Sequence, residues 1–448
     1  MRRRVARRPL DVVIVGAGIG GLAAAITIRQ AGHRVRVLEA ASELREAGAG
    51  MQLAPNATRL LQRWGLEIEL QKVGVEPQAL VFRRYADGET VGRTEWRNSM
   101  RGRYAAPYYH VHRQDLHRIL HEKLASDIEI STKSRVSAIT AANNSPGDRP
   151  QVHLENGDVI TADMVVGADG IRSFVRSYVT GQPDQAVPTG DAAYRAVIDA
   201  DAIRATGDPN LLRLIDQRET TVWMGPYKHI VGYNVSNQRQ FNLVMIHPDR
   251  GYSESWTTPG DVQRMRDEYQ GWEPSILKLL GLIEGAWVWR LNLRDPISSW
   301  VDTDAHVTLL GDARGPMLPY MAQGGAMAIE DAAVLGRLLS RIETRKDIPR
   351  LLRAYQDIRQ ARVTQAQLAS GANRTLFHVP DGPAQEARDS KMRAAWRDSQ
   401  SVVTDRQPTE NVDHRHMEQE AEKGRIHEIL AYDADAEADR WLAADRFV

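Results

Sequence analysis

The sequence contains no cysteine among its 448 residues. This absence excludes disulfide bonds, metal sites with thiolate ligands, and catalysis by a cysteine nucleophile. A chain without cysteine also suits a reducing compartment, so we expect a cytoplasmic protein.

The sequence also has no excess of charge of either sign. Lys+Arg and Asp+Glu both number 58, so the formal net charge is zero. Proteins that bind nucleic acid or an anionic membrane surface usually carry a basic excess, and we expect neither partner. The composition is 42% hydrophobic and 26% charged, which is ordinary for a soluble globular protein. Its length predicts two or three lobes.

The N-terminus has some features of an export signal and lacks others. Arginine fills five of the first eight positions, and the apolar run DVVIVGAGIGGLAAAITI follows shortly after. Asp11 interrupts the start of this run, Gly and Ala dilute its middle, and no A-x-A cleavage site with a new polar start appears. We therefore expect the run to belong to the fold.

This run begins a pattern that is typical of dinucleotide binding. DVVIV (11–15) predicts a short buried parallel strand. Gly16, Gly18 and Gly21 form G-x-G-x-x-G at the start of a predicted helix, and a second strand, HRVRVLEA, ends in Glu39. The pattern is more specific than the three glycines alone, because they stand between a strand and a helix and an acid follows at the expected distance.

Each of these residues has a physical task in such a unit. Gly16 allows the tight turn, Gly18 lets the backbone approach a pyrophosphate, and Gly21 lets the helix pack closely on the strand. The helix N-terminus stabilises phosphate charge, and Glu39 can accept hydrogen bonds from a ribose hydroxyl pair. An acid at position 39 disfavours a 2′-phosphate, which leaves NAD or the ADP half of FAD.

Two later segments repeat the order of apolar strand, glycine and acid. A hairpin with an Asn156–Gly157 turn is followed by a strand that ends at Gly167 and Asp169. A third strand ends at Gly311–Asp312. Open α/β sheets bind ligands at the carboxyl edge of their strands, so we expect these acids and Glu39 to lie near one another.

Together, these motifs resemble those of FAD-dependent aromatic hydroxylases, the single-component class that includes salicylate and hydroxybenzoate hydroxylases. The resemblance covers nearly all of the chain and rests on three motifs in order: VVIVGAGIGG…LEA, GADGIRS and GDARGPMLPYMAQGGAMAIEDA. HVHRQDLHRIL and FHVPDGPAQEARD are similar to the fungal branch of the class.

The resemblance implies an α/β fold with a Rossmann-like FAD-binding domain built on a parallel sheet of the glutathione-reductase type. The two parts of this domain are expected at 1–184 and 301–375, an inserted β-sheet substrate domain at 185–300, and a helical C-terminal region at 376–448. Alternating strand patterns within 185–300 agree with this division. The polar C-terminal tail could serve in packing or in the contacts of a homodimer.

The resemblance also implies contacts with the flavin half of FAD. Asp312 is expected to hydrogen-bond the ribityl chain, and the loop 314–325 to lie along the isoalloxazine. Gly324 and Gly325, just before a helix expected at 326–339, would aim backbone amides at the flavin O2 region and stabilise a reduced, anionic ring.

Three further positions follow from the same comparison of motifs. Arg113, in HRQDL, is expected to contact the cofactor. Arg45 and AGAGMQLAPNA resemble the loop that passes over the flavin, where Gly50 would allow close approach; an ordinary surface loop is the alternative. Gly315 stands where such enzymes usually carry His. Any chemistry that those enzymes assign to this His therefore cannot be assigned to the present chain. We expect Gly315 either to enlarge the pocket or to loosen the loop.

The substrate residues are predicted from the middle of the chain. Arg195 lies in an apolar strand pattern, where an unpaired charge is costly. It can anchor an anionic substrate through its planar fork, or it can form a structural ion pair. Tyr227 and His229 follow a Gly225–Pro226 turn, and either could polarise or deprotonate a phenol; a role in the turn alone is the alternative.

The implied reaction uses NADH or NADPH and O2. NAD(P)H reduces FAD, O2 adds at flavin C4a, and the hydroperoxide transfers its distal oxygen to an electron-rich aromatic substrate. We see no metal-ligand cluster, and DHRHMEQE (413–420) is expected on a solvated helix. Two alternatives remain: a flavin oxidase or dehydrogenase on the same fold, and a non-catalytic flavin-binding protein, which Gly315 alone would favour.

Overall fold

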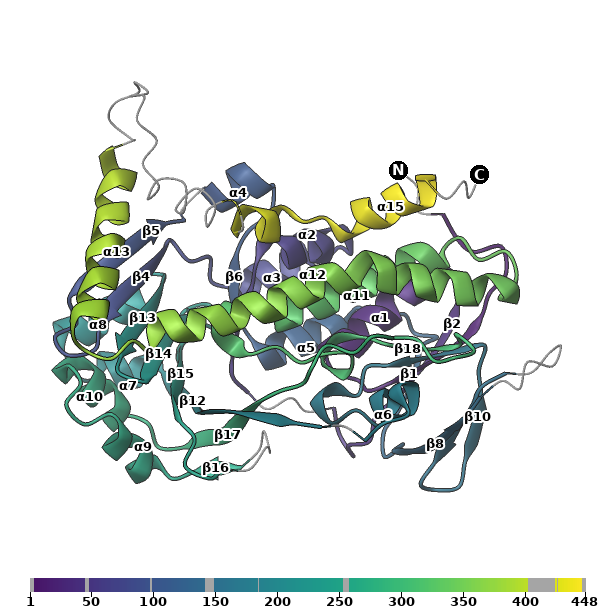
Figure 1. Cartoon of the computed structure of the whole chain (residues 1–448), viewed down its shortest axis with the longest axis horizontal. Coiled ribbons are helices and arrows are strands. Elements are labelled where there is room, and N and C mark those ends of the chain that lie inside the picture. The colour runs from purple at the N-terminus through teal and green to yellow at the C-terminus, as the bar shows by residue number, and fades with distance from the viewer. Residues whose placement is uncertain are drawn as a thin grey trace.

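The computed structural model describes residues 4–44, 48–96, 99–141, 149–183, 185–252, 258–401, 424 and 426–444. Arg45 and the segment 413–420 lie outside these residues. The chain builds two main sheets and a set of helices that runs alongside both (Figure 1).

The first main sheet is parallel and carries the dinucleotide fingerprint. Its strand order is β18 (Val307–Leu309), β11 (Met164–Gly167), β1 (Asp11–Val15), β2 (Arg34–Leu38) and β7 (Glu129–Ser131). All four pairings are parallel, so the loops that follow these strands leave from one edge of the sheet. The strands predicted before Gly16, Glu39, Gly167 and Gly311 are confirmed.

The two faces of this sheet are covered differently, because successive side chains of a strand point to opposite sides. Val12 and Ile14 of β1 join a core with helices α1 (Ile19–Gln30) and α11 (Gly324–Leu339). Val13 and Val15 instead join a core with the small antiparallel sheet of β8 (Val136–Thr140), β9 (Gln151–Leu154) and β10 (Val159–Thr161). The predicted hairpin turn at Asn156–Gly157 joins β9 to β10.

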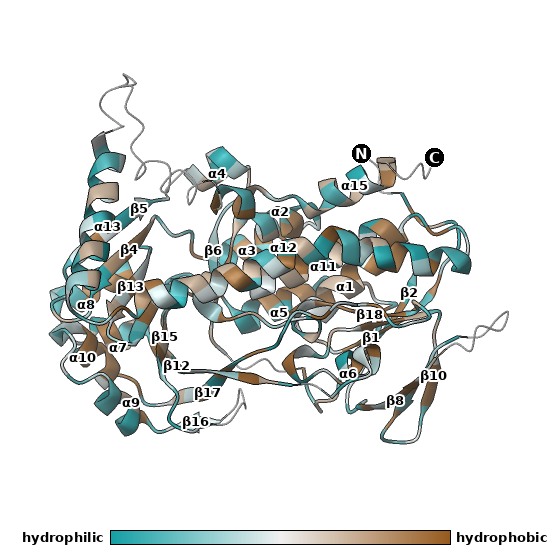
Figure 2. Cartoon of the chain, in the orientation of Figure 1, coloured by the Kyte–Doolittle hydropathy of each residue, from teal (hydrophilic) through white to brown (hydrophobic). Residues whose placement is uncertain are grey.

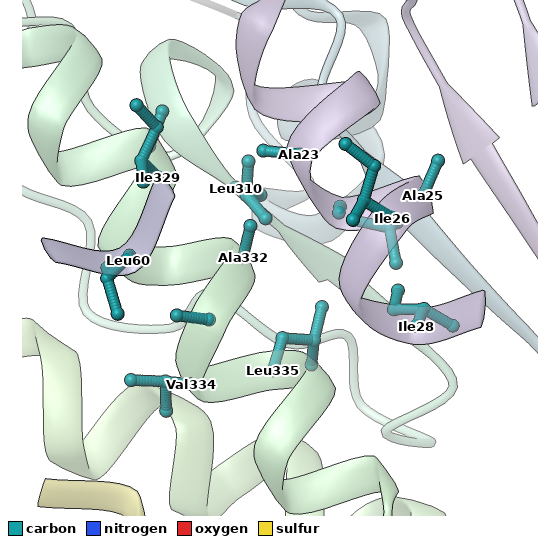
Figure 3. Close-up of a cluster of buried hydrophobic side chains, with 14 of the residues drawn as sticks. Ala23, Ala25, Ile26, Ile28, Leu60, Leu310, Ile329, Ala332, Val334 and Leu335 are labelled. Atoms are coloured by element: carbon teal, nitrogen blue, oxygen red, sulfur yellow. The ribbon is translucent and has the colours of Figure 1, made fainter. Parts of the chain in front are cut away.

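Helices α1 and α11 are buried against each other, with small and branched side chains at their contact (Figure 3). Thr27 Oγ1 donates a hydrogen bond across this contact to the carbonyl of Ala332, at 2.7 Å. Helix α11 begins at Gly324, two residues earlier than predicted. Gly324 and Gly325 therefore form its first turn and do not precede it.

The second main sheet has eight strands. Their order is β16 (Pro259–Gly260), β17 (Ala286–Leu293), β12 (Val187–Asp199), β15 (Gln240–Pro248), β14 (Lys228–Val235), β13 (Glu219–Gly225), β4 (Ala79–Arg84) and β5 (Thr90–Glu95). The strands predicted within 185–300 are confirmed, and β4 and β5 extend the sheet from an earlier part of the chain. A two-stranded sheet, β3 (Gly50–Leu53) with β6 (Tyr109–His112), lies next to it, and the backbone amide of Gly50 donates a hydrogen bond to the side-chain oxygen of Asn242.

The remaining helices pack around these sheets. Helix α12 (Ile348–Phe377) runs from the parallel sheet to the larger sheet, and α13 (Pro383–Ser401) packs beside β5 (Figure 1). A helical segment at 426–431 and α15 (Ala434–Ala444) end the described chain. The shorter helices are α2 (Pro55–Arg63), α3 (Glu67–Val73), α4 (Ser99–Tyr104), α5 (Arg113–Glu122), α6 (Phe174–Thr180), α7 (Ala200–Arg204), α8 (Pro209–Asp216), α9 (Val262–Glu268) and α10 (Pro274–Gly281).

Hydrophobic residues dominate the ribbon of α11, whereas α9 is mostly hydrophilic (Figure 2). This contrast matches their positions, since α11 is buried along nearly its whole length and α9 lies on the outside. None of the described helices is both long and apolar enough to cross a lipid bilayer.

Candidate active site

The fingerprint glycines occupy positions where a side chain would not fit. Gly16 has φ +104°, and a Cβ there would lie 2.4 Å from the carbonyl oxygen of Ala168. A Cβ at Gly21 would lie 1.9 Å from the carbonyl oxygen of Gly16, so the helix and the turn are in direct backbone contact. Gly18 caps α1 with extended backbone and lines a cavity. This is the geometry that a bound pyrophosphate needs at a helix N-terminus.

Glu39 is held at the end of β2 by two backbone amides. Its Oε2 accepts a hydrogen bond from Ala17 N at 2.9 Å, and its Oε1 accepts one from Ala41 N at 2.8 Å. Glu39 does not line the main cavity. The carboxylate therefore lies beside the fingerprint loop, where the ribose of a bound adenosine is expected.

The acid after β11 has a different role from the acids after β2 and β18. Asp169 accepts a hydrogen bond from Ser173 Oγ at 2.5 Å and another from Val175 N at 3.1 Å. Burial raises the pKa of Asp169 above its usual range. Asp169 thus fixes the turn into α6. Asp312, by contrast, lines the cavity from the short 3-10 turn Gly311–Ala313.

A single cavity of about 650 Å³ separates the carboxyl edge of the parallel sheet from one face of the larger sheet. The predicted residues that line it are Gly18, Gly50, Arg113, Arg195, His229, Asp312, Gly324 and Gly325. Gly16, Gly21 and Glu39 lie at the fingerprint and outside its lining. The cavity is therefore the place where residues predicted from distant parts of the chain come together.

The N-terminus of α11 faces this cavity. The first amides of a helix have no partner within the helix and form its positive end. A Cβ at Gly325 would lie 1.8 Å from Met51 Cε, whereas the atoms nearest to a Cβ at Gly324 are 3.9 Å away or more. A Cβ at position 325 would meet only the flexible end of the Met51 side chain, and both glycines line the cavity.

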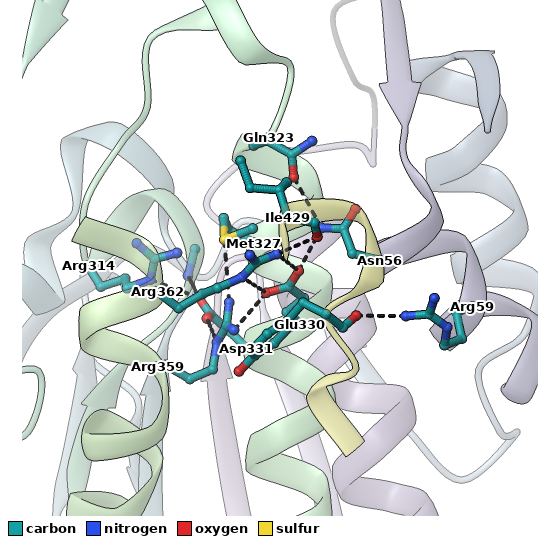
Figure 4. Close-up of polar contacts among 12 residues, drawn as sticks. Asn56, Arg59, Arg314, Gln323, Met327, Glu330, Asp331, Arg359, Arg362 and Ile429 are labelled. Carbon is teal, nitrogen blue, oxygen red and sulfur yellow. Dashed lines mark hydrogen bonds and ion pairs between the residues drawn. The ribbon is translucent and has the colours of Figure 1, made fainter. Parts of the chain in front are cut away.

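A buried polar network holds α11 in place (Figure 4). Asp331 accepts from Arg314 Nε and from Arg359 Nε, both at 2.8 Å. Glu330 pairs with Arg359 at 2.6 Å and Arg362 at 2.9 Å. Burial alone would raise the pKa of Asp331, but Arg314 and Arg359 hold it below its usual value. The sequence motifs do not indicate these roles, although two adjacent acids in an apolar helical pattern are a signal of buried ion pairs.

Arg195 projects from β12 into the cavity beside an aromatic ring. Its Cζ lies 4.3 Å from the centroid of the Trp289 ring. Burial lowers the pKa of Arg195 to about 10; Tyr233 opposes this shift and Arg113 adds to it. A pKa of about 10 leaves the guanidinium charged at neutral pH. Arg195 and Arg113 thus lie close enough to form one positive region on the cavity wall.

His229 and Tyr227, which were predicted as alternatives, lie in different surroundings. His229 is buried, lines the cavity, and places Nδ1 2.8 Å from His378 Nε2. Burial holds the pKa of His229 well below 6.5. The side chain of Tyr227 is 59% exposed, its φ is +60°, and it does not line the cavity. The turn thus directs His229 inward and Tyr227 outward.

Two glycines have environments that differ from those expected. Gly315 is buried, and a Cβ there would lie 2.9 Å from Gln367 Nε2, which also donates to the carbonyl of Pro316. Gly315 does not line the cavity, and Gln367 occupies the space beside it. Gly50 is a strand residue; its amide donates to Asn242 Oδ1 at 2.6 Å, and a Cβ would clash with Asn242 and Tyr233.

The comparison with known proteins agrees with this geometry. Residues 9–370 match the family described as FAD binding domain. The FAD-dependent monooxygenase OpS4 of Beauveria bassiana (strain ARSEF 2860) is 36% identical over 392 residues, covering 86% of this chain and 90% of that protein. The 3-amino-4-hydroxybenzoate 2-monooxygenase PtnB3 of Streptomyces platensis is 35% identical and covers 86% of this chain and 93% of that protein.

Solved structures share the fold as well. Klebsiella pneumoniae HpxO complexed with FAD and uric acid has a TM-score of 0.72 at 25% identity, over 86% of this chain and 92% of that one. A salicylate hydroxylase substrate complex has a TM-score of 0.75 at 24% identity, over 96% and 97% of the two chains.

The chain belongs to the FAD binding domain family and is an FAD-dependent monooxygenase. The predicted resemblance to aromatic hydroxylases, the fold class and FAD as cofactor are confirmed. NADH or NADPH as cosubstrate is typical of this family.

Proposed function

We propose that this enzyme hydroxylates the ring of a small phenolic or salicylate-like substrate, with NADH or NADPH as the electron donor and O2 as the oxygen source. One observation carries the proposal: a single cavity is lined by Asp312 and Gly324 on the cofactor side and by Arg195 on the sheet side. Relatives of this chain are named for 3-amino-4-hydroxybenzoate and 3-hydroxybenzoate, which agrees with an anionic aromatic substrate.

The residues present fit FAD in shape and charge. The glycine cradle and Glu39 would hold the ADP half, while Asp312 and the first amides of α11 would face the ribityl chain and the ring. Arg113 and Gly50, which line the same cavity, would complete the cofactor contacts. Bound FAD supplies the redox chemistry, that is, acceptance of electrons from NAD(P)H and transfer of oxygen.

In this proposal, Arg195 binds the negative charge of the substrate. Its planar guanidinium offers two parallel donors to a carboxylate, and its stacking on Trp289 limits its orientation. The positive region made with Arg113 also favours the ionised form of a phenol, and a phenolate is a better nucleophile than the neutral ring.

His229 accepts the phenol proton. Its low pKa keeps the imidazole neutral near pH 7. In this proposal its Nδ1–H donates to His378 Nε2, so Nε2 is unprotonated and can take the phenol proton. Tyr227 is not part of this proposal because its ring is exposed and outside the cavity lining.

The test is a screen of hydroxylated aromatic acids for stimulated NADH or NADPH oxidation. Each active compound is then analysed by mass spectrometry after reaction under ¹⁸O2. Ring hydroxylation requires a product with one added oxygen atom that carries the label. Peroxide formation without any oxygenated product would favour a flavin oxidase, and no stimulation by any compound would favour a non-catalytic flavin-binding protein.

Three further predictions accompany this proposal. We propose the division into FAD-binding parts (1–184 and 301–375), substrate domain (185–300) and C-terminal region (376–448), with β4 and β5 completing the substrate sheet. We also propose a cytoplasmic location, which the absence of cysteine supports.

The third prediction is that the enzyme forms a homodimer. Analytical ultracentrifugation of the holoenzyme tests this prediction directly.

A further inference from the structure

The cavity face of the larger sheet has a charged end and an apolar end. The strand pairings place Arg195, Val244, Val231, Val222 and Phe82 opposite one another on β12, β15, β14, β13 and β4. All five residues line the cavity. They form one row across the sheet, with a single cation at one end and only hydrocarbon beyond it.

This row is longer than a single-ring substrate. Four steps between neighbouring strands, each about 4.8 Å, separate Arg195 from Phe82 by roughly 19 Å. An aromatic acid with its carboxylate at Arg195 covers less than two of these steps. A compound of that size would leave unfilled the part of the cavity along β13 and β4, where Val222 and Phe82 pack beside Phe377 and all three line the cavity.

A loop on the cofactor side of the cavity packs against the row from its charged end to its middle. Leu318 and Tyr320, from the loop expected along the flavin, pack in one cluster with Val244 and Trp289, and Val231 packs against this cluster. The ring to be hydroxylated must lie at this half, next to the cofactor. The other half, from Val222 to Phe82, lies beyond it.

The apolar lining of the cavity also includes side chains that reach solvent. Leu80 and Leu376 pack in one cluster with Phe82, and Trp96 packs against Tyr108, another lining residue. Leu80, Leu376 and Trp96 are only partly buried, and Ile426, which also lines the cavity, is 49% exposed. Ile426 comes from the helical segment near the C-terminus, outside the matched residues 9–370. Large apolar side chains that gather at the mouth of a cavity are typical of a binding surface for an apolar ligand.

The charged groups of the cavity stay at the opposite end. Among the described residues that line it, the formally charged ones are Arg113, Arg195, Arg290 and Asp312. Arg290 lies on β17, the strand beyond β12 on the side away from β4. A ligand that follows the row therefore passes from a cationic region to an uncharged one.

We propose that the natural substrate is an aromatic acid or phenol that carries an apolar substituent several carbon atoms long. The acidic group lies at Arg195, the ring lies beside the cofactor, and the substituent crosses β13 and β4 to the mouth formed by Phe82, Trp96 and Ile426. This inference rests on the proposed function and adds the substrate class to it.

The test is a series of salicylates with unbranched alkyl chains, from methyl to heptyl, placed in turn at each free ring position. Dissociation constants are measured from the change in flavin absorbance of the holoenzyme, which requires no turnover. At one or more ring positions, the affinity should rise about fourfold with each added methylene, the gain expected for a buried CH2 group. The hydroxylated product is measured for each compound in parallel.

Variants locate the effect in the protein. Ile426→Ser and Phe82→Ser should reduce the gain per methylene. Leu368→Ser, which changes an equally apolar residue that is 69% exposed and does not line the cavity, should keep the wild-type gain. FAD content and circular dichroism confirm that each variant is folded.

The outcomes separate the two proposals. Binding and hydroxylation of the parent salicylates with no gain from the chain at any position, or a gain that both cavity variants retain, overturns this inference and leaves the proposed function intact. No binding or hydroxylation of any member of the series overturns the proposed function, and this inference with it.

Discussion

The imidazole of His229 forms a hydrogen bond with that of His378, with 2.8 Å between Nδ1 and Nε2. The two residues are 149 positions apart in the chain and meet where β14 reaches the end of α12. The contact fixes the orientation of the His229 ring and leaves its Nε2 for the cavity.

This geometry changes the pH dependence expected for the reaction. A histidine of ordinary pKa would give an acid limb of kcat/KM near pH 6.5. Burial and the neighbouring His378 lower the pKa of His229, so its neutral form, the proton acceptor, persists as the pH falls through 6.5. We expect the acid limb below pH 6.5. His229→Asn should remove this limb and lower kcat on the order of 10²-fold. The matched control is His121→Asn, an exposed residue of α5; a variant at position 229 that keeps the limb contradicts the assignment.

Glu39 should act in cofactor binding and not in the reaction. Its carboxylate accepts from Ala17 N and Ala41 N beside the fingerprint, outside the cavity lining. We expect Glu39→Gln to raise the dissociation constant of FAD by about tenfold, which corresponds to 1.4 kcal/mol. Turnover at saturating FAD should change little. Fluorescence titration of the apoprotein measures the first quantity and steady-state kinetics the second. Loss of turnover at full FAD occupancy would mean that Glu39 has been placed wrongly.

Arg195→Lys should not behave as a conservative change. Lysine keeps the charge but loses the planar pair of donors and the stacking on Trp289. We expect the dissociation constant of an anionic aromatic substrate to rise by about tenfold or more, while FAD content stays normal. Arg118→Lys, on the exposed face of α5 where Arg118 pairs with Glu122, is the control. Unchanged substrate affinity in the Arg195 variant would exclude an anchoring role.

The buried network on α11 should be needed for stability. Asp331 lies between Arg314 and Arg359, and all three side chains are 0% or 1% exposed. Replacing one partner leaves a buried charge without compensation, so Asp331→Asn should lower the free energy of unfolding by about 3–5 kcal/mol. The exposed pair of Arg29 and Asp127 supplies the control, and Asp127→Asn should cost less than about 1 kcal/mol. Denaturant unfolding measures both; equal effects of the two substitutions would show that the network contributes no more than a surface pair.

The sequence alone determined the positions of the residues that we propose hold the cofactor. Gly16, Gly18, Gly21 and Glu39 belong to one continuous unit of strand, turn, helix and second strand, so their spacing carries the geometry directly. Asp312 could be predicted for the same reason, since it follows directly after a short apolar strand. Local backbone rules decide these positions, and they act over a few residues.

Tertiary structure decided which residues line the part of the cavity that we propose binds the substrate. The row from Arg195 to Phe82 comes from five strands, and which side chains face the cavity depends on the pairing register, because a slip of one residue would turn each of them to the other face. The sequence could not separate His229 from Tyr227 for the same reason. Gln367 fills the space beside Gly315 because α12 packs against the core there. Ile426 lines the cavity because the C-terminal segment packs against the same core. Contacts between residues so far apart follow from the packing of whole elements and not from local spacing.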